Sequence, residues 1–174
     1  NIVVSLISTQ LIVLVPALVF LKVTKTTPEF ISHKRLHPVT PVLCVVYTAL
    51  IMPLITEVNL ISMLFVENRA NQLAYEMLHV PGWLLILIVG ILGPMNEEFI
   101  CRGVYYHSYK HTTGRATAAM FMSAMIFGLL HLNFNQMSYA FVVGIMAVLL
   151  IEATGSIWSS IIMNIPFQFC LWRN

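Results

Sequence analysis

Long apolar runs dominate this chain, and they restrict it to folds built from membrane-spanning helices. The first run, residues 2–21, has about 20 mostly apolar residues, which is the length an α-helix needs to cross a hydrocarbon core about 30 Å thick. Over the whole chain 59% of the residues are hydrophobic and 9% are charged, whereas soluble domains carry about 25% charged residues. The sequence therefore predicts an all-α integral membrane protein, with membrane lipid as a partner. A formal net charge of +2, scattered along the chain, gives no reason to expect nucleic acid.

The apolar runs and the polar segments between them predict a polytopic helical bundle of about six spans. The expected spans are residues 2–21, 41–65, 82–110, 116–131, 139–151 and 157–172. In the third span, Gly93-Pro94 is expected to kink the helix, because proline removes a backbone donor. Basic residues collect in the loops at 22–37 and 107–115, and the positive-inside rule assigns such loops to the cytoplasm. The short loops favour a multi-pass protein of a bacterial plasma membrane.

The third span carries two adjacent carboxylates, Glu97 and Glu98, in a chain with seven acidic residues. An ionised side chain at bilayer depth costs roughly 2.5–3.5 kcal/mol on insertion scales, so such residues are functional candidates. Arg102 is four residues after Glu98 and shares its face of a helix, which allows a structural ion pair. Glu97 is rotated by about 100° from Glu98 and points elsewhere.

A spacing argument connects the carboxylates to a histidine. If the chain turns at Gly114 between antiparallel helices, Glu97 and Glu98 lie 17 and 16 residues before the turn, and His131 lies 17 residues after it. At about 1.5 Å per residue, all three are roughly 24–26 Å from the turn and meet at one depth. A carboxylate and an imidazole at one depth can take a proton from water. The alternative is a zinc ion with Glu98 and His131 as ligands.

These residues form motifs that resemble a known family. EExxxR at Glu97–Arg102 is followed by FxxxH at Phe127 and His131, by FxxG at Phe141 and Gly144, and by Gly155-Ser156-Ile157-Trp158 at the start of the last span. In this order, over about residues 80–170, they resemble the CAAX protease and bacteriocin-processing (CPBP or Abi) family of intramembrane proteases. The resemblance implies an N-terminal part of transmembrane helices with an outer loop (residues 1–80) and a catalytic core (residues 81–174).

The resemblance also implies roles for individual residues. Glu97 and Glu98, with His131, would activate the water that attacks a peptide bond. Arg102 would hold the second carboxylate, and Asn164 would polarise the scissile carbonyl. Phe127 and Gln168 would support them.

The last motif departs from the family pattern. The family's final helix usually carries HxxxN, and here the two positions are Asn164 and Gln168. Another register reads Ser160 and Asn164, which keeps the Asn and loses the His. Side-chain amides can donate to an oxyanion, but they are poor zinc ligands compared with histidine. Zinc is therefore one of two alternatives, the other being no metal.

Three functions are compatible with the sequence. The first is an intramembrane endopeptidase acting on a membrane-associated or lipidated peptide. The second is a catalytically weak family member acting as a bacteriocin immunity protein, which the departure at Asn164 favours. The third is a transporter or proton relay that uses intramembrane carboxylates; internal repeats would support it, and none is visible.

Overall fold

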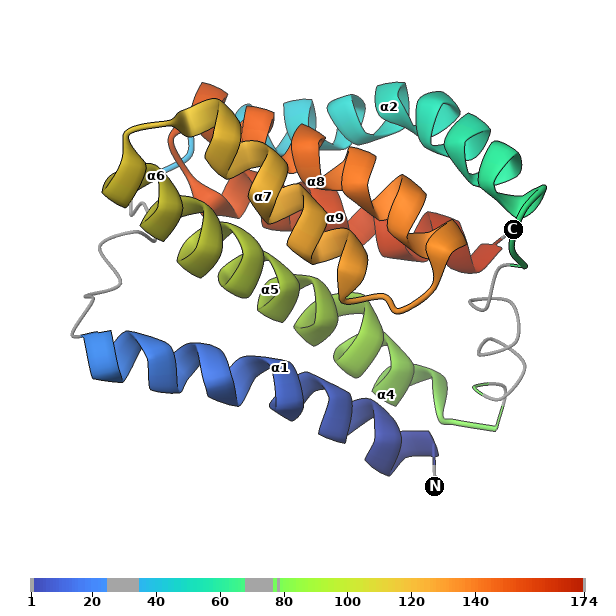
Figure 1. Cartoon of the computed structure of the whole chain (residues 1–174). Helices are drawn as coiled ribbons and strands as arrows, with labels where there is room; N and C mark the ends of the chain where they lie inside the picture. The colour runs from blue at the N-terminus through green and yellow to red at the C-terminus, as the bar shows by residue number, and fades with distance from the viewer. Residues whose placement is uncertain (1, 25–34, 68–76, 78, 174) are drawn as a thin grey trace.

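The computed structural model describes residues 2–24, 35–67, 77 and 79–173 of the chain, and these residues form a bundle of helices (Figure 1). No strand is found among the residues so described, so the all-α prediction is confirmed. The helices are α1 (Ile2–Thr24), α2 (Thr40–Met63), α4 (Gly82–Leu85), η2 (Ile86–Leu92), α5 (Gly93–Glu98), η3 (Phe99–Tyr106), α6 (His107–Thr113), α7 (Ala116–Leu129), α8 (Phe134–Thr154) and α9 (Ile157–Arg173).

Within the described residues, four helical stretches are long and apolar enough to cross a membrane. They are Ile2–Thr24, Thr40–Met63, Gly82–Thr113 and Phe134–Thr154. The expected fourth span, α7, has 14 residues, which at about 1.5 Å per residue gives about 21 Å, less than the hydrocarbon thickness. The helical bundle is thus as predicted, while length and composition qualify four of its stretches as spans. The expected fifth span begins earlier than predicted, at Phe134, because Asn133 caps that helix by accepting a hydrogen bond from the Gln136 backbone N–H.

The third span is one long helix from Gly82 to Thr113 rather than two helices separated by a break. Gly93 and Pro94 lie inside this continuous helix, directly after the π-helical segment η2. The irregularity takes the form of two π-helical segments, η2 before α5 and η3 after it. π-Segments inside α-helices are frequent at functional sites, and here they flank the paired carboxylates.

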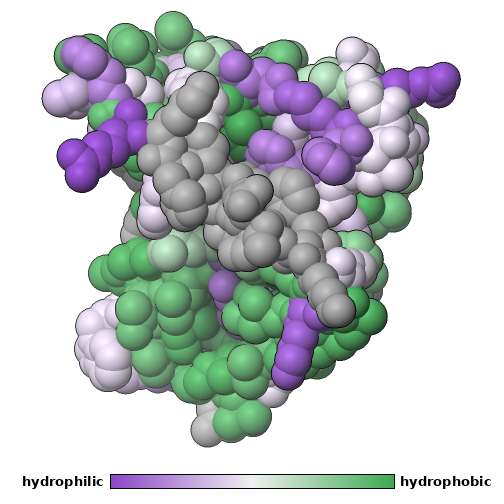
Figure 2. All heavy atoms as spheres, turned by 90° about the vertical axis from the view of Figure 1, so that its left-hand side faces the viewer, coloured by the Kyte–Doolittle hydropathy of each residue, from purple (hydrophilic) through white to green (hydrophobic). Residues whose placement is uncertain are grey.

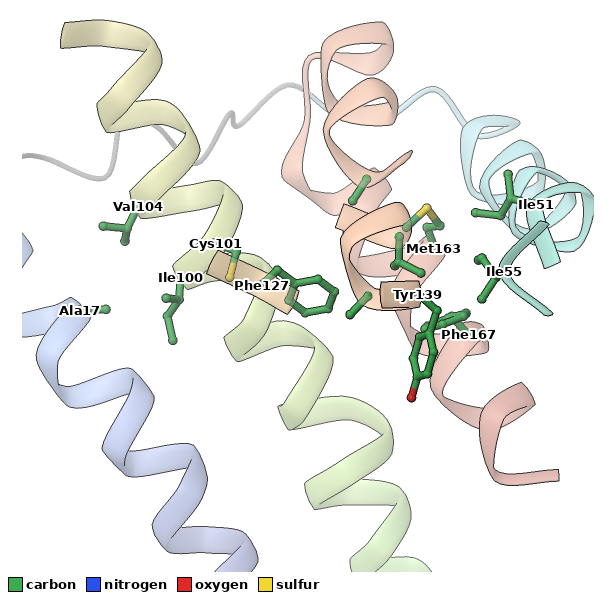
Figure 3. Packing of buried hydrophobic residues seen from close by; sticks show 13 residues of the cluster. Ala17, Ile51, Ile55, Ile100, Cys101, Val104, Phe127, Tyr139, Met163 and Phe167 are labelled. Atoms are coloured by element: carbon green, nitrogen blue, oxygen red, sulfur yellow. The ribbon is translucent and has the colours of Figure 1, made fainter. Parts of the chain in front are cut away.

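The long helix lies between α1 and the rest of the bundle (Figure 1). On one side it contacts α1, and on the other it contacts α7 and α9, while α2 packs on α8 and α9. Figure 3 shows the main apolar core, in which Phe127 lies between the long helix at Cys101 and the side chains of Met163 and Tyr139. This packing places α5, α7 and α9 around one buried region.

The end of α1, the start of α2 and the turn between α6 and α7 lie at the same end of the bundle (Figure 1). The turn is made by Gly114, which adopts a left-handed conformation with φ of 68°. Figure 2 views this end, and most of its hydrophilic side chains gather on the upper part of the face. The described ends that border the first basic loop therefore lie at the same end of the bundle as the turn of the second, while residues 25–34 lie outside the described residues.

Candidate active site

Glu98 and Arg102 form a fully buried ion pair. Both side chains are 0% exposed, and Arg102 Nη1 lies 2.9 Å from Glu98 Oε1. The spacing of four residues puts them on one face of the long helix, even though η3 begins at Phe99. Two unpaired buried charges would each carry a large desolvation cost, so each residue requires the other.

Asn164 of α9 lies between the two carboxylates. Its Nδ2 donates to Glu98 Oε1 at 3.0 Å and, over a longer 3.4 Å, to Glu97 Oε2. Asn164 is 0% exposed. Both N–H groups of this amide therefore face carboxylates, which differs from the expectation that Asn164 is free to polarise a substrate carbonyl.

Phe127 joins this cluster to His131. The Arg102 guanidinium carbon lies 4.4 Å from the centre of the Phe127 ring, a distance at which a cation is attracted to an aromatic face. The His131 ring meets the same Phe127 ring edge to face at 5.1 Å. His131 Nδ1 is 2.9 Å from the Phe127 carbonyl oxygen. Because a carbonyl can only accept, Nδ1 carries the hydrogen in this contact, and Nε2 of the neutral ring is left as the basic nitrogen.

Glu97 and His131 line one cavity of about 240 Å³. Both side chains are half-buried. No hydrogen bond joins them directly, as far as the described side chains show. The other lining residues come from α1, α5, η3, α7 and α8: Thr9, Gln10, Val13, Asn96, Ile100, Phe127, Leu130 and Gln136. The structure thus brings His131 to the depth of the carboxylates, and it is Glu97 rather than Glu98 that faces the cavity.

A second and more apolar cavity of about 340 Å³ lies further along the same helices, toward the basic end. It is lined by Phe20, Val104, Tyr105, Ser108, Tyr109, Thr112, Thr113, Met122, Ser123 and Ile126. Both cavities are bordered by α1, the long helix and α7, and the first is also bordered by α8.

Gly144, the glycine of FxxG, permits the close approach on which the cluster depends. A Cβ at this position would lie 2.8 Å from Ala124 Cα and 3.4 Å from Arg102 Nη2. Real side chains do not tolerate the first distance. A glycine at this position therefore lets α8 pack against α7 and leaves space for the guanidinium.

None of the last-motif positions, Ser160, Asn164 and Gln168, is among the residues that line the cavity. Gln168 is half-buried on α9 and is not among the cavity's lining residues. Ser160, the other possible start of the motif, is fully buried and donates to the Ile157 carbonyl oxygen at 2.9 Å. Both Ser160 and Asn164, one turn apart on α9, therefore contact Glu98, and Asn164 also reaches Glu97.

The donors near the carboxylates do not fit a zinc ion. Zinc sites usually have three or four protein ligands in a tetrahedral arrangement. Glu98 Oε1 already accepts from Arg102 and Asn164, and His131 has only its Nε2 to offer, because its Nδ1 faces a backbone carbonyl. Across the described ranges, no group of three His, Cys, Asp or Glu side chains could hold a metal ion.

Sequence reasoning missed the contribution of α1. Gln10 and Thr9 line the cavity, and Gln10 Oε1 accepts a hydrogen bond of 2.9 Å from Asn96 Nδ2. The available signal was an amide side chain inside an otherwise apolar run, next to a pair of hydroxyl residues at 8 and 9.

Comparison with known proteins agrees with these motifs. A family model described as Type II CAAX prenyl endopeptidase Rce1-like matches residues 79–169, just over half of the chain. No curated protein and no solved structure matches the chain. The matched range contains Glu97, Glu98, Arg102, His131 and Asn164, whereas α1 and α2 precede it. The chain is thus an integral multi-pass membrane protein that belongs to the Rce1-like family of type II CAAX prenyl endopeptidases.

Proposed function

We propose that this protein is an intramembrane endopeptidase that hydrolyses a peptide bond of a membrane-associated, lipidated peptide, with Glu97 as the base. The observation that carries the proposal is the shared cavity of Glu97 and His131. A carboxylate and the free nitrogen of an imidazole at the wall of one cavity can hold a water molecule between them.

The two adjacent carboxylates have different surroundings, which favours different roles. Glu98 is fully buried, paired with Arg102 and bonded to Asn164. Its Oε1 is engaged by both partners, and the side chain is fully buried and is not among the residues that line the cavity. Glu97 is half-buried, faces the cavity and has one long contact with Asn164. Glu97 is therefore the carboxylate suited to take a proton from water.

In the proposed reaction, water donates one hydrogen bond to Glu97 and a second to His131 Nε2. Glu97 takes a proton as the water oxygen bonds to the scissile carbonyl carbon, which forms a tetrahedral oxyanion. Collapse of this intermediate breaks the C–N bond, and the proton held by Glu97 passes to the leaving amine. The fixed positive charge of Arg102 balances Glu98 next to the base.

The apolar cavity supports a lipidated substrate. It lies beside the first cavity along the same helices and is lined mainly by aromatic and aliphatic side chains. Burial of apolar surface there would stabilise binding by about 25 cal/mol per Å². Membership in the Rce1-like family makes a prenylated peptide the first substrate to test.

The proposal is tested by cleavage of fluorogenic membrane peptides, with and without a prenyl group, by the purified protein in lipid nanodiscs. We expect Glu97→Gln and His131→Ala to abolish cleavage while the folded protein remains. Thr56→Val, which changes an exposed hydroxyl on α2, is the control. Cleavage that survives Glu97→Gln at the wild-type rate would contradict the assignment.

A second function is favoured by the position of Asn164. Its amide is committed to two carboxylates, and hydrogen bonding to a carboxylate lowers its basicity. A weakly active member of the family that works by binding, such as a bacteriocin immunity protein, is the alternative. Protection of cells by the Glu97→Gln variant at normal expression would favour this binding role over proteolysis.

A further inference from the structure

Gln10 is a side-chain amide in α1, a helix that is mostly apolar and barely packed against the rest of the protein. The most apolar window of α1 has only 6% of its residues buried inside the protein. An amide in a hydrocarbon environment is costly unless it is hydrogen-bonded. Gln10 is half-buried and turns toward the long helix, where its Oε1 accepts from Asn96 Nδ2 at 2.9 Å.

The amide of Gln10 sits directly over a glycine of the long helix. A Cβ at Gly93 would lie 3.6 Å from Gln10 Nε2. The residue that donates to Gln10, Asn96, is the neighbour of Glu97 in sequence, and both line the cavity together with Gln10. The Gln10 amide is thus held at the depth of the proposed base, where α1 borders the cavity.

The hydrogen bond from Asn96 is accepted by Oε1 of Gln10, so Nε2 of the same amide takes no part in it. Within the described parts of the chain, Gln10 Nε2 has no hydrogen-bond partner, and its two N–H groups can donate only. If Gln10 only held α1 against the long helix, the hydrogen bond from Asn96 would be sufficient, and no further donor would be needed. A remaining donor beside the base is suited to a carbonyl oxygen.

We propose that Gln10 is a substrate-binding residue, and that α1 forms one wall of the site. This inference rests on the proposed function and deepens it. Nε2 of Gln10 donates to a main-chain carbonyl oxygen of the extended peptide next to the scissile bond, while Asn96 fixes the orientation of the amide. The ligand chemistry is that of a peptide backbone. Gln10 lies outside residues 79–169, the range the family model matches.

A binding measurement tests the inference without relying on cleavage. In a Glu97→Gln background, a photoreactive benzoylphenylalanine replaces Val13, which lines the cavity, or Ile12, which is 70% exposed on the same helix. The probe is a biotinylated prenylated peptide in nanodiscs. We expect labelling at position 13 that excess unlabelled peptide suppresses, and no suppressible labelling at position 12. Equal labelling at the two positions, or none at 13, would overturn the inference.

Two substitutions of Gln10 then separate substrate binding from tethering. Gln10→Leu removes the hydrogen bond, and we expect the peptide concentration for half-maximal labelling at position 13 to rise about 3- to 10-fold, the range for one neutral hydrogen bond. Gln10→Glu keeps an acceptor for Asn96 but removes both N–H donors. A substrate-binding role predicts at least as large a rise for Gln10→Glu, whereas a tether predicts wild-type labelling. Ser5→Ala, at an exposed position of α1, is the matched control.

The same variants with Glu97 intact distinguish failure of the inference from failure of the proposed function. Loss of one uniform binding contact raises KM and leaves kcat unchanged, so we expect that pattern for Gln10→Leu. If the wild type cleaves the peptide and Gln10→Leu has an unchanged KM, the inference about Gln10 is wrong and the proposed protease function still stands. If labelling at position 13 is suppressed by unlabelled peptide but no cleavage occurs, the proposed protease function is wrong and the peptide-binding site still stands.

Discussion

The guanidinium of Arg102 lies over the ring of Phe127, with 4.4 Å between the guanidinium carbon and the ring centre. The same ring meets His131 edge to face. The two motifs EExxxR and FxxxH are therefore in contact through one aromatic side chain. The Phe127 ring therefore sets the distance between the buried Glu98–Arg102 ion pair and His131.

Phe127→Leu should lower both stability and activity. The change removes a cation–π contact, worth up to about 2 kcal/mol when desolvated, and opens space in the core. His131 also loses the surface against which it packs. We expect a lower unfolding temperature and a reduced kcat, measured in the same nanodiscs. Phe121→Leu is the matched control, because Phe121 is on the same helix and 47% exposed; an equal loss in both variants would contradict the special position of Phe127.

The two carboxylates should respond differently to the same substitution. Glu98→Gln leaves Arg102 as a buried charge without its counter-charge, which typically costs about 3–5 kcal/mol. We expect Glu98→Gln to lower the unfolding temperature strongly and Glu97→Gln to leave it within a few degrees while abolishing cleavage. Thermal unfolding and peptide cleavage measured side by side check both. A large loss of stability in Glu97→Gln would show that the division of roles is wrong.

Gly144→Ala should destabilise the contact between α7 and α8. The new Cβ would lie 2.8 Å from Ala124 Cα and 2.9 Å from Ala124 Cβ, so the helices must move apart. Overpacking of this kind costs about 1–3 kcal/mol. Gly82→Ala is the control, since a Cβ there meets nothing within 4 Å. Equal unfolding temperatures for the two variants would contradict the packing argument.

The sequence was sufficient to predict the helical bundle, because a run of about 20 apolar residues is long enough for a membrane-spanning helix. It also placed Glu98 and Arg102 on one face and brought His131 to the depth of Glu97. These predictions rest on the rise and period of a helix, which are the same wherever a helix occurs.

Other features depend on contacts between helices, which no spacing rule contains. The commitment of Asn164 to both carboxylates follows from how α9 packs on α5. The role of Gln10 follows from the position of α1, more than 80 residues earlier in the chain than Asn96. The π-segments η2 and η3 lie on either side of α5, where a kink at Gly93-Pro94 was expected, and the helix continues through the proline.

Cleavage should not depend on an added metal ion. In the described part of the chain no three His, Cys, Asp or Glu side chains are grouped so that they could hold one metal ion, and Glu98 Oε1 is already engaged by Arg102 and Asn164. We expect the rate of peptide cleavage to be unchanged after treatment with a strong zinc chelator and dialysis. A rate that falls on chelation and returns when zinc is added would contradict this prediction, and His131→Ala would then be expected to lower zinc binding.

The substitution of most consequence is Asn164→His, which places the family's usual side chain on the last helix. An imidazole at this position can donate to Glu98 and, unlike the amide, can also carry a proton to or from a reacting group. The site is fully buried, so the larger ring should cost about 1–3 kcal/mol of stability. We expect a higher kcat despite that cost, because Glu97 is released from its contact with the amide. Asn164→Leu is the control: it removes the donor shared by the two carboxylates, and both stability and cleavage should fall. If Asn164→His reduces cleavage as far as Asn164→Leu does, the amide itself is required for activity. Asn164 would then contribute to catalysis, and its presence would not weaken the site.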